Sequence, residues 1–161
     1  MASDIFLKIK GIDGESKDKT HEKEIEIQSF SWGVSNPSSV GHGTGMGTGR
    51  CTISSLNFMK EMDMASCKLF FKCAGGDHID EATLTVRKSG GTTPLEYYKL
   101  SLKQVFVDSM HWTGASGGGQ VNESFSLSFN EVGIDYCSQN EKGAKGDPDS
   151  ASWNIKSNAP S

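Results

Sequence analysis

The stretch from Glu123 to Tyr136, E-S-F-S-L-S-F-N-E-V-G-I-D-Y, decides the fold class of this chain of 161 residues. Up to Phe129 its apolar side chains alternate with serines, the pattern of a strand with one apolar and one polar face. From Val132 the apolar series continues on even-numbered positions. One extra residue near Asn130–Glu131, a β-bulge, would keep both halves on the same face. The predicted strand is about 45 Å long, well beyond the usual ~5–6 residues, and it favours a curved, barrel-like wall.

Further segments show the same period-two pattern, and several of them also shift their apolar phase by one residue part-way. Repeated shifts are typical of a closed or strongly coiled sheet, in which bulges take up the bend. The sequence therefore predicts a mainly β protein. The predicted strands are Asp4–Lys10, Glu24–Trp32, Arg50–Phe58, Glu81–Lys88, Leu95–Ser109 and a short final strand around Trp153 and Ile155.

A single amphipathic helix is predicted from Asp63 to Ala74. Asp63 can cap its start, and Gly75-Gly76 can end it. Four apolar residues fall at helical spacing and form one stripe, which we expect to cover part of the sheet. The stripe consists of Cys67, Phe70, Phe71 and Ala74.

The length favours one domain over residues 1–161. A domain of this size buries about 68–70% of its unfolded-chain surface, so it needs no metal or disulfide to fold. Residues 11–23 mix both charge signs and are predicted to form a solvated loop. Residues 139–150 are polar and expected to be mobile, and residues 157–161 are expected to form a disordered tail.

Composition disfavours several classes of partner. The net charge of −4 and the isoelectric point of about 5.5 argue against nucleic acid, which needs a clustered basic face, and against an anionic membrane surface. The apolar runs are too short for membrane insertion. The N-terminus enters a strand pattern almost at once, so no signal peptide is predicted. The four cysteines show no C-x-x-C spacing, and we expect thiols made in a reducing cytoplasm.

Two glycine-rich motifs match catalytic or nucleotide-binding patterns only in part. Gly114–Gly118 reads G-x-S-x-G around Ser116, but a nucleophile elbow needs a helix after it, and here a strand follows. Gly41–Gly49 lacks the Lys-Ser/Thr pair and the following helix of a phosphate loop. The histidines lie in predicted loops and are expected at the surface: His21, His42, His78 and His111. We therefore predict no catalytic residue, no cofactor and no metal, and a protein that is not an enzyme.

Three motifs resemble, in order and spacing, the haemolysin-coregulated protein (Hcp) family of bacterial type VI secretion. They are G-E-S-K-D-K-T-H at Gly14–His21, F-S-W-G at Phe30–Gly33 and L-T-V-R-K-S-G-G at Leu84–Gly91. The resemblance implies a β-barrel of two sheets with one flanking helix, similar to phage tail-tube subunits. It also implies hexameric rings that stack into a tube inside a contractile sheath, beneath a spike protein. The family's tubes leave the cell without a signal peptide, and many members hold effector proteins in the ring lumen.

A water-filled lumen needs a lining of small polar side chains, and ring formation needs contacts between copies. The candidate lumen- or cargo-facing residues are Thr85, Ala115, Ser116, Ser124 and Ser126. The candidate contacts between subunits or rings are Phe6, His42, Met46 and Trp112. Serine rows also occur on ordinary solvated sheets, and Phe6 could instead lie under the helix.

Two other functions stay open at this stage. A monomeric β-barrel module would hold a ligand in a roomy interior, and a hydrolase would use Ser116. The tube hypothesis predicts instead a packed barrel core and a ring of several chains.

Overall fold

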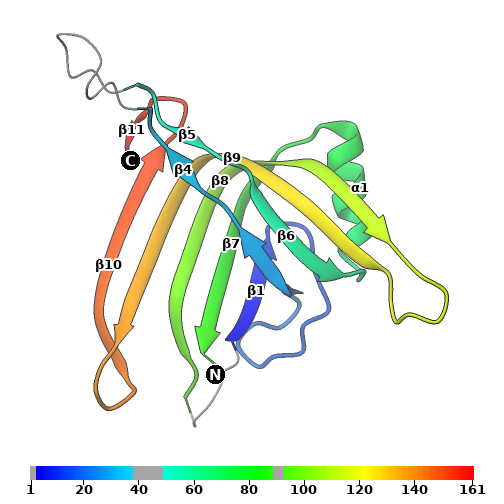
Figure 1. Cartoon of the computed structure of the whole chain (residues 1–161), viewed down its shortest axis with the longest axis horizontal. Helices are drawn as coiled ribbons and strands as arrows, with labels where there is room; N and C mark the ends of the chain where they lie inside the picture. The colour runs from blue at the N-terminus through cyan, green and yellow to red at the C-terminus, as the bar shows by residue number, and fades with distance from the viewer. Residues whose placement is uncertain (1–2, 38–48, 89–92) are drawn as a thin grey trace.

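The computed structural model describes residues 3–37, 49–88 and 93–161. A nine-stranded sheet, a two-stranded sheet and one helix confirm the predicted mainly β class (Figure 1). The first elements are β1 (Ser3–Ile9), β2 (Ile25–Glu26), β3 (Ser29–Ser31), β4 (Val34–Ser35), β5 (Thr52–Ile53), β6 (Leu56–Glu61) and α1 (Ser66–Gly75). They are followed by β7 (Ile79–Lys88), β8 (Leu95–Thr113), β9 (Asn122–Gln139), β10 (Lys145–Asn154) and β11 (Ala159–Pro160).

The large sheet closes into a barrel. β9, β8, β7 and β1 are antiparallel neighbours in that order. β2 pairs with β1, β3 pairs with β6, and β6 pairs with the first half of β9, so the path returns to its start. The chain changes its partner strand from β1 to β6 between two adjacent residues. Ile27 N donates to Ile5 O of β1 (3.0 Å), and Gln28 N donates to Met59 O of β6 (2.8 Å). The single strand predicted from Glu24 to Trp32 is therefore wrong, because the chain changes partner strands inside it.

The strand predicted from Arg50 to Phe58 is also two strands. β5 leaves the barrel and pairs with β4, where Val34 faces Ile53, to make the small second sheet. β6 stays in the barrel between β3 and β9. The apolar phase shift in this segment thus marks a break between two sheets.

The long strand read from the opening motif is present as β9, and β8 runs antiparallel beside it. The predicted bulge at Asn130–Glu131 is wrong, because the pairing with β8 keeps one register on both sides of this point. β8 changes its own apolar phase there, at Gln104, which has a φ of 52°, a conformation uncommon for residues other than glycine. Both strands therefore turn together and keep their apolar side chains on the core.

Beyond the barrel, the second half of β9 continues with β10 and β11 as an extension of the sheet (Figure 1). Residues 139–150, expected to be mobile, form the β9–β10 turn and much of β10. Residues 157–161, expected to be disordered, contain β11, which pairs with the end of β10. Only the end of β10 was predicted, as the short final strand around Trp153 and Ile155, and Ile155 itself lies just beyond it. The rest of β10 has no period-two alternation, because both of its faces are largely exposed.

The helix is confirmed, but its start and its orientation differ from the prediction. Its N-cap is Ala65 without a side-chain hydrogen bond, and Asp63 instead accepts a hydrogen bond from Ala65 N (3.0 Å). Gly76 ends the helix with a φ of 68°. Leu69 is fully buried and packs into the core. The predicted stripe does not cover the sheet: Cys67, Phe70, Phe71 and Ala74 are all exposed.

Side chains fill the interior of the barrel. Each strand of the closed path except β3 contributes inward residues with almost no exposed surface, and Phe58 stacks on Phe125 with ring centroids 4.9 Å apart. The fully buried apolar residues include Leu7, Ile25, Leu56, Leu69, Leu84, Leu100, Val105 and Leu127.

Candidate functional site

Small polar side chains line the outer face of β3, β6, β8 and the first half of β9. β8 shifts register against β9 between Val107 and Ser109. The carboxylate of Asp108, the residue at this shift, accepts hydrogen bonds from Ser55 Oγ (2.6 Å) and Ser128 Oγ (2.8 Å). A hollow of about 450 Å³ lies in this face. Its polar lining consists of Ser29, Ser31, Asn57, Ser109, His111 and Ser124. We call this surface the serine face.

The candidate lumen residues fall in different places. Ser124 borders the hollow of the serine face, whereas Ser126 is only 5% exposed and its Oγ lies 2.7 Å from Ser109 Oγ. Ala115 and Ser116 are exposed in the loop that joins β8 to β9. Thr85 is 2% exposed and lies in β7, opposite Phe6 of β1. The serine face thus brings together Ser124 and Ser126 but not Thr85.

Phe6 is covered by its own chain. It is 4% exposed, its ring stacks on His21 with centroids 4.5 Å apart, and the Arg87 guanidinium lies 4.9 Å from its centroid. The loop of residues 11–23, which carries His21, therefore takes the place that the prediction gave to a neighbouring subunit. Phe6 does not lie under the helix either.

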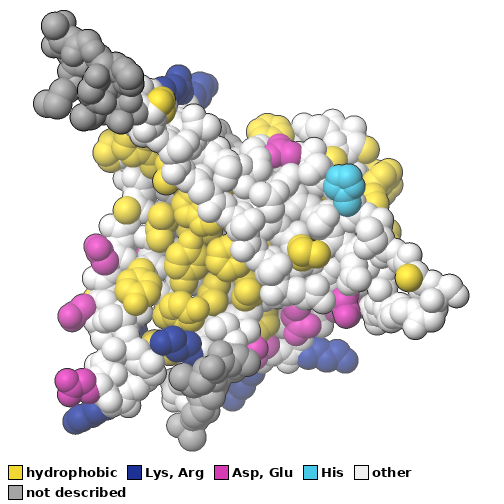
Figure 2. Space-filling model, in the orientation of Figure 1, with side chains coloured by type: hydrophobic (Ala, Val, Ile, Leu, Met, Phe, Trp, Pro, Cys, Tyr) yellow, Lys and Arg dark blue, Asp and Glu magenta, His cyan; other side chains and the backbone are white. Residues whose placement is uncertain are grey.

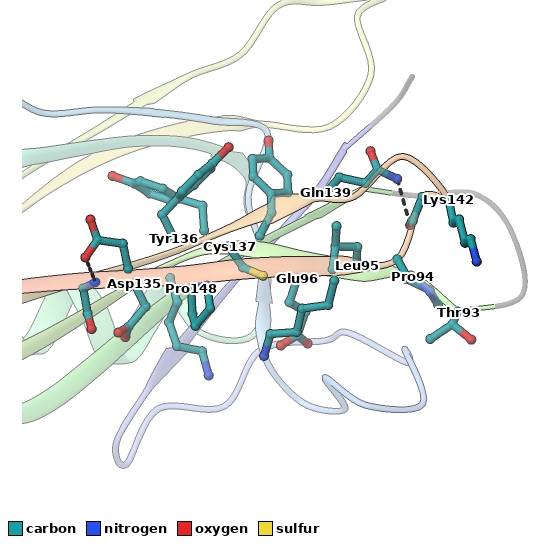
Figure 3. Close-up of a pocket in the computed structure, with 18 residues that line it drawn as sticks. Thr93, Pro94, Leu95, Glu96, Asp135, Tyr136, Cys137, Gln139, Lys142 and Pro148 are labelled. Carbon is teal, nitrogen blue, oxygen red and sulfur yellow. Dashed lines mark hydrogen bonds between the residues drawn. The ribbon is translucent and has the colours of Figure 1, made fainter.

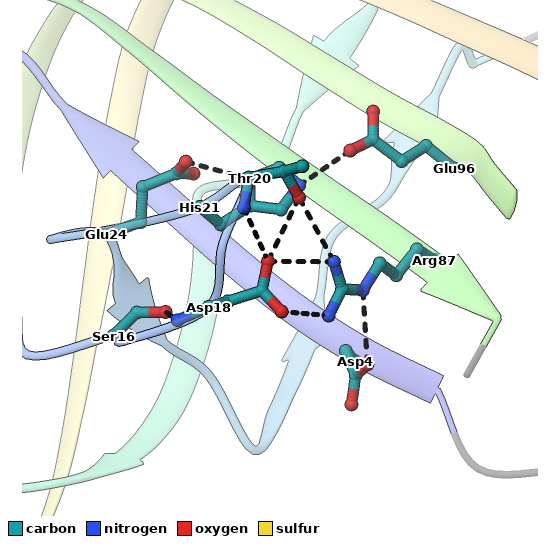
Figure 4. A network of polar contacts seen from close by, with 8 residues as sticks. All are labelled: Asp4, Ser16, Asp18, Thr20, His21, Glu24, Arg87 and Glu96. Carbon is teal, nitrogen blue, oxygen red and sulfur yellow. Dashed lines mark hydrogen bonds and ion pairs between the residues drawn. The ribbon is translucent and has the colours of Figure 1, made fainter. Parts of the chain in front are cut away.

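Two clusters of polar side chains, one around Arg87 and one around His21, fasten this loop to the barrel (Figure 4). Arg87 Nη1 donates to Asp18 Oδ2 (2.9 Å), its Nη2 donates to Asp18 Oδ1, and its Nε donates to Asp4 Oδ2 (3.2 Å). These hydrogen bonds from Arg87 hold the pKa of Asp18 well below its usual range, because they stabilise the carboxylate form. The same contacts raise the pKa of Arg87.

His21 is buried, which corrects its predicted place at the surface. Only 7% of it is exposed, and its two ring nitrogens lie 2.7 Å from Glu24 Oε2 and 2.6 Å from Glu96 Oε1. Glu96 is 75 positions away in the sequence, so no local pattern could indicate the pair. His21 therefore fixes the loop to the barrel, while most of residues 11–23 are exposed, as predicted for a solvated loop.

A third polar cluster joins α1 to the barrel. Lys60 and Glu123 are fully buried and form an ion pair. Lys60 Nζ also donates to Asp63 Oδ1 (2.8 Å) and Ser66 Oγ (3.1 Å). Glu123 accepts hydrogen bonds from Ser66 Oγ (2.9 Å) and Trp112 Nε1 (2.8 Å). Every charge in the cluster is paired, as buried charges require.

The sequence does carry a signal for this cluster. Lys60 follows Leu56 and Phe58 in the inward phase of β6, and Glu123 precedes Phe125 and Leu127 in the inward phase of β9. Two opposite charges in the apolar phase of strands indicate a buried pair. The cluster also fixes Trp112, which is 39% exposed and lies 6.2 Å from the Phe70 ring.

The extension carries an apolar face that is continuous with the core. Its members point to the same side, because Ala151 pairs with Ile134 and Trp153 pairs with the core residue Val132. Tyr136, next on this face, is 49% exposed. Figure 2 shows the hydrophobic side chains gathered over this part of the sheet. We call Ile134, Tyr136, Ala151 and Trp153 the extension face.

A cleft of about 1060 Å³ lies at the open end of the extension (Figure 3). Residues from the start of β8, the end of β9 and the β9–β10 turn line it, among them Tyr136 and Cys137. Gln139 Nε2 donates to Gly143 O (2.9 Å) and holds the turn beside it. The lining carries charged side chains of both signs, among them Glu96, Lys99, Asp135 and Lys142.

The family model described as "Type VI secretion system effector, Hcp" matches residues 6–136. The chain belongs to the Hcp family. It is 41% identical over 159 residues to Protein hcp1 of Pseudomonas aeruginosa, with 98% of each chain covered. A solved structure described as a type six secretion system protein matches with a TM-score of 0.93 and 30% identity over 99% of this chain and all of the other. Hcp1 from Salmonella typhimurium matches with a TM-score of 0.81 and 36% identity over the full length of both.

Two predicted contact residues of this Hcp chain, His42 and Met46, lie outside the described residues. Within residues 3–37, 49–88 and 93–161, no group of three His, Cys, Asp or Glu side chains is placed to hold a metal ion. The four cysteines are free thiols. Over the same ranges, no helix has the length and hydropathy to span a bilayer.

Proposed function

We propose that this Hcp chain is the tube subunit of a type VI secretion apparatus, with a structural and not an enzymatic role. Six copies form a ring, and rings stack head to tail into a tube, because contacts between unlike faces leave a free face at each end. The tube is made in the bacterial cytoplasm, lies within the sheath beneath the spike protein, and is exported by the apparatus.

The observation that carries this proposal is the open extension. In a single chain the extension face leaves an apolar surface beside the core partly in water, although burying such surface stabilises by roughly 25 cal/mol per Å². The outer edge of β10 pairs with β11 only at Trp153 and Asn154 within the described part of the chain. Both features fit a wall that a neighbouring copy continues, since unpaired sheet edges readily add a strand.

The serine face is the proposed lining of the ring lumen. Its hydroxyl groups donate and accept hydrogen bonds, so they can contact varied effector surfaces directly or through water. Ser124, Ala115 and Ser116 are the proposed cargo contacts. Thr85 and Ser126, which are buried in the subunit, are left out of this set.

Light scattering after size exclusion tests the ring, and negative-stain images test its shape. We expect a particle of six 17.3-kDa chains with a central hole. A stable monomer at high micromolar concentration would contradict the proposal.

Cargo binding is tested separately. Ser124→Trp places a bulky side chain in the proposed lumen, and we expect rings that retain much less effector on co-purification. Ser157→Trp, at an exposed position after β10, is the matched control and should retain the wild-type amount. Equal retention by both variants would move the cargo site away from the serine face.

The two rival functions fit the observations less well. A ligand-binding barrel needs interior space, whereas Phe58, Leu100 and Leu127 fill the barrel. A hydrolase needs Ser116 at the start of a helix, whereas β9 follows its loop. Ser116→Ala should therefore leave secretion of cargo nearly intact.

A further inference from the structure

We infer that the exposed stripe of α1 is one half of the contact between neighbouring subunits of a ring, and that the extension face of the next copy covers it. The inference rests on the proposed ring and names the surfaces that build it.

The stripe is an unpartnered apolar helix face. Phe70 is 49% exposed and Phe71 is 71% exposed, and their ring centroids lie 5.9 Å apart. Trp112 from the end of β8 adds its ring to this cluster. Large exposed aromatic groups that lie together mark contact sites. We call Cys67, Phe70, Phe71, Ala74 and Trp112 the helix patch.

The helix patch is rigid within the subunit. Leu69, between the exposed residues, is fully buried, and Ser66 at the start of α1 is held by Lys60 and Glu123. Glu123 also holds the Trp112 indole. Because the patch is already rigid, it loses little conformational entropy on contact. This favours a patch that binds a protein partner over one that is exposed by chance.

The position of the patch fits a second copy of this chain. α1 lies on one side of the barrel, and β10 lies on the opposite side (Figure 1). In a ring, one side of each subunit meets the other side of the next, so the two contact surfaces must differ and complement each other. The helix patch and the extension face are two such surfaces, and both are apolar at their centres.

The charges at their rims are complementary. α1 carries Lys68 and Lys72 and no acidic residue. The extension carries exposed Asp149 opposite Tyr136, together with exposed Asp147, whereas its lysines Lys142 and Lys145 lie in the β9–β10 turn and at the start of β10. Acidic side chains follow the outer edge of β10 in Figure 2. Opposite charges at the rim of an apolar contact fix its orientation and oppose wrong pairings.

Disulfide formation between native Cys67 and an introduced Ala151→Cys tests the pairing directly. Both positions are exposed, so the substitution removes no core contact. Mild oxidation, or a short bismaleimide cross-linker, should give a ladder of covalent oligomers that ends at the size of one ring. The same Ala151→Cys variant with Cys67→Ser should give no ladder. Ser152→Cys, on the opposite face of β10, is the second control and should link poorly.

Substitutions at the surface test the energetics. Phe71→Asp should raise the concentration at which rings dissociate about tenfold or more, while circular dichroism stays that of the wild type. Val34→Asp, at a residue 64% exposed in β4, should leave that concentration unchanged. Lys72→Glu and Asp149→Lys should each weaken the ring about 2–5-fold, a scale typical of exposed pairs, and together they should recover part of that loss.

The outcomes separate this inference from the proposed function. If the Ala151→Cys variant forms normal rings but gives no covalent ladder through Cys67, the inference is overturned and the tube role stands. A ladder that runs past the size of one ring would assign the helix patch to stacking and also overturn it. A wild-type chain that stays monomeric would refute the tube role itself.

Discussion

Replacing Lys60 with Met should cost this subunit more stability than any single change at its surface. Lys60 and Glu123 are both fully buried, and the variant leaves the carboxylate of Glu123 in the core with only the donors from Ser66 and Trp112. Removal of one partner of a buried ion pair costs about 3–5 kcal/mol. In a chain of this length each kcal/mol lowers the melting temperature by about 2–4 °C, so we expect a fall of roughly 6–20 °C.

A double-mutant cycle shows whether the charge itself is responsible. Glu123→Gln keeps an acceptor for Trp112 and Ser66, and in combination with Lys60→Met it removes both buried charges. The double variant should therefore be less destabilised than the sum of the single variants, by about 1–3 kcal/mol. Urea unfolding at fixed protein concentration, followed by tryptophan fluorescence, measures each term. A loss below about 1 kcal/mol for Lys60→Met, or strict additivity in the cycle, would refute the reasoning.

Two further predictions concern the loop of residues 11–23 and the end of α1. The hydrogen bonds from Arg87 lower the pKa of Asp18, so this pair contributes stability above the ordinary Asp pKa of about 3.9 and loses it as the pH falls below that value. Asp18→Asn should therefore be less stable than the wild type at pH 7 and approach it in acid, as measured by urea midpoints at both pH values; a gap that widens in acid would contradict this. Gly76→Ala should lower stability by about 1 kcal/mol, because the φ of 68° at Gly76 strains residues with a Cβ. Gly75→Ala is its control, and equal melting temperatures for the two variants would exclude strain at Gly76.

The parts of the fold that the sequence predicted are those with one buried and one exposed face. β7, β8 and the first half of β9 bury one side against the core, so their period-two patterns are visible. β10 has no such pattern, because both of its faces are largely exposed in the single chain. The phase shift at Asn130–Glu131 was located correctly, but one strand alone could not show that β8 turns with it.

The candidate site was predictable only where it depends on neighbours along the chain. The serine row of β9 is plain in the sequence, and Ser124 does lie in the serine face. The burial of Phe6 was not predictable, since it depends on His21, which depends in turn on Glu96 from a distant strand. Thr85 shares the outward phase of β7 with the partly exposed Thr83 and Arg87, yet it is buried.

The helix stripe shows that an amphipathic pattern alone does not identify the surface that covers the apolar side of a helix. Helical periodicity reports that Cys67, Phe70, Phe71 and Ala74 share one side, and it cannot report whether that side meets the chain's own core. Here the apolar anchors of α1 on the barrel are Leu69, the N-cap residue Ala65 and the partly buried Cys73, Ser66 adds polar contacts, and the larger stripe points outward. A helix that needs so few core contacts can carry its aromatic residues on the outside, where a second copy can reach them. If neighbouring copies meet as inferred above, the stripe belongs to the core of the ring and not to the core of the subunit.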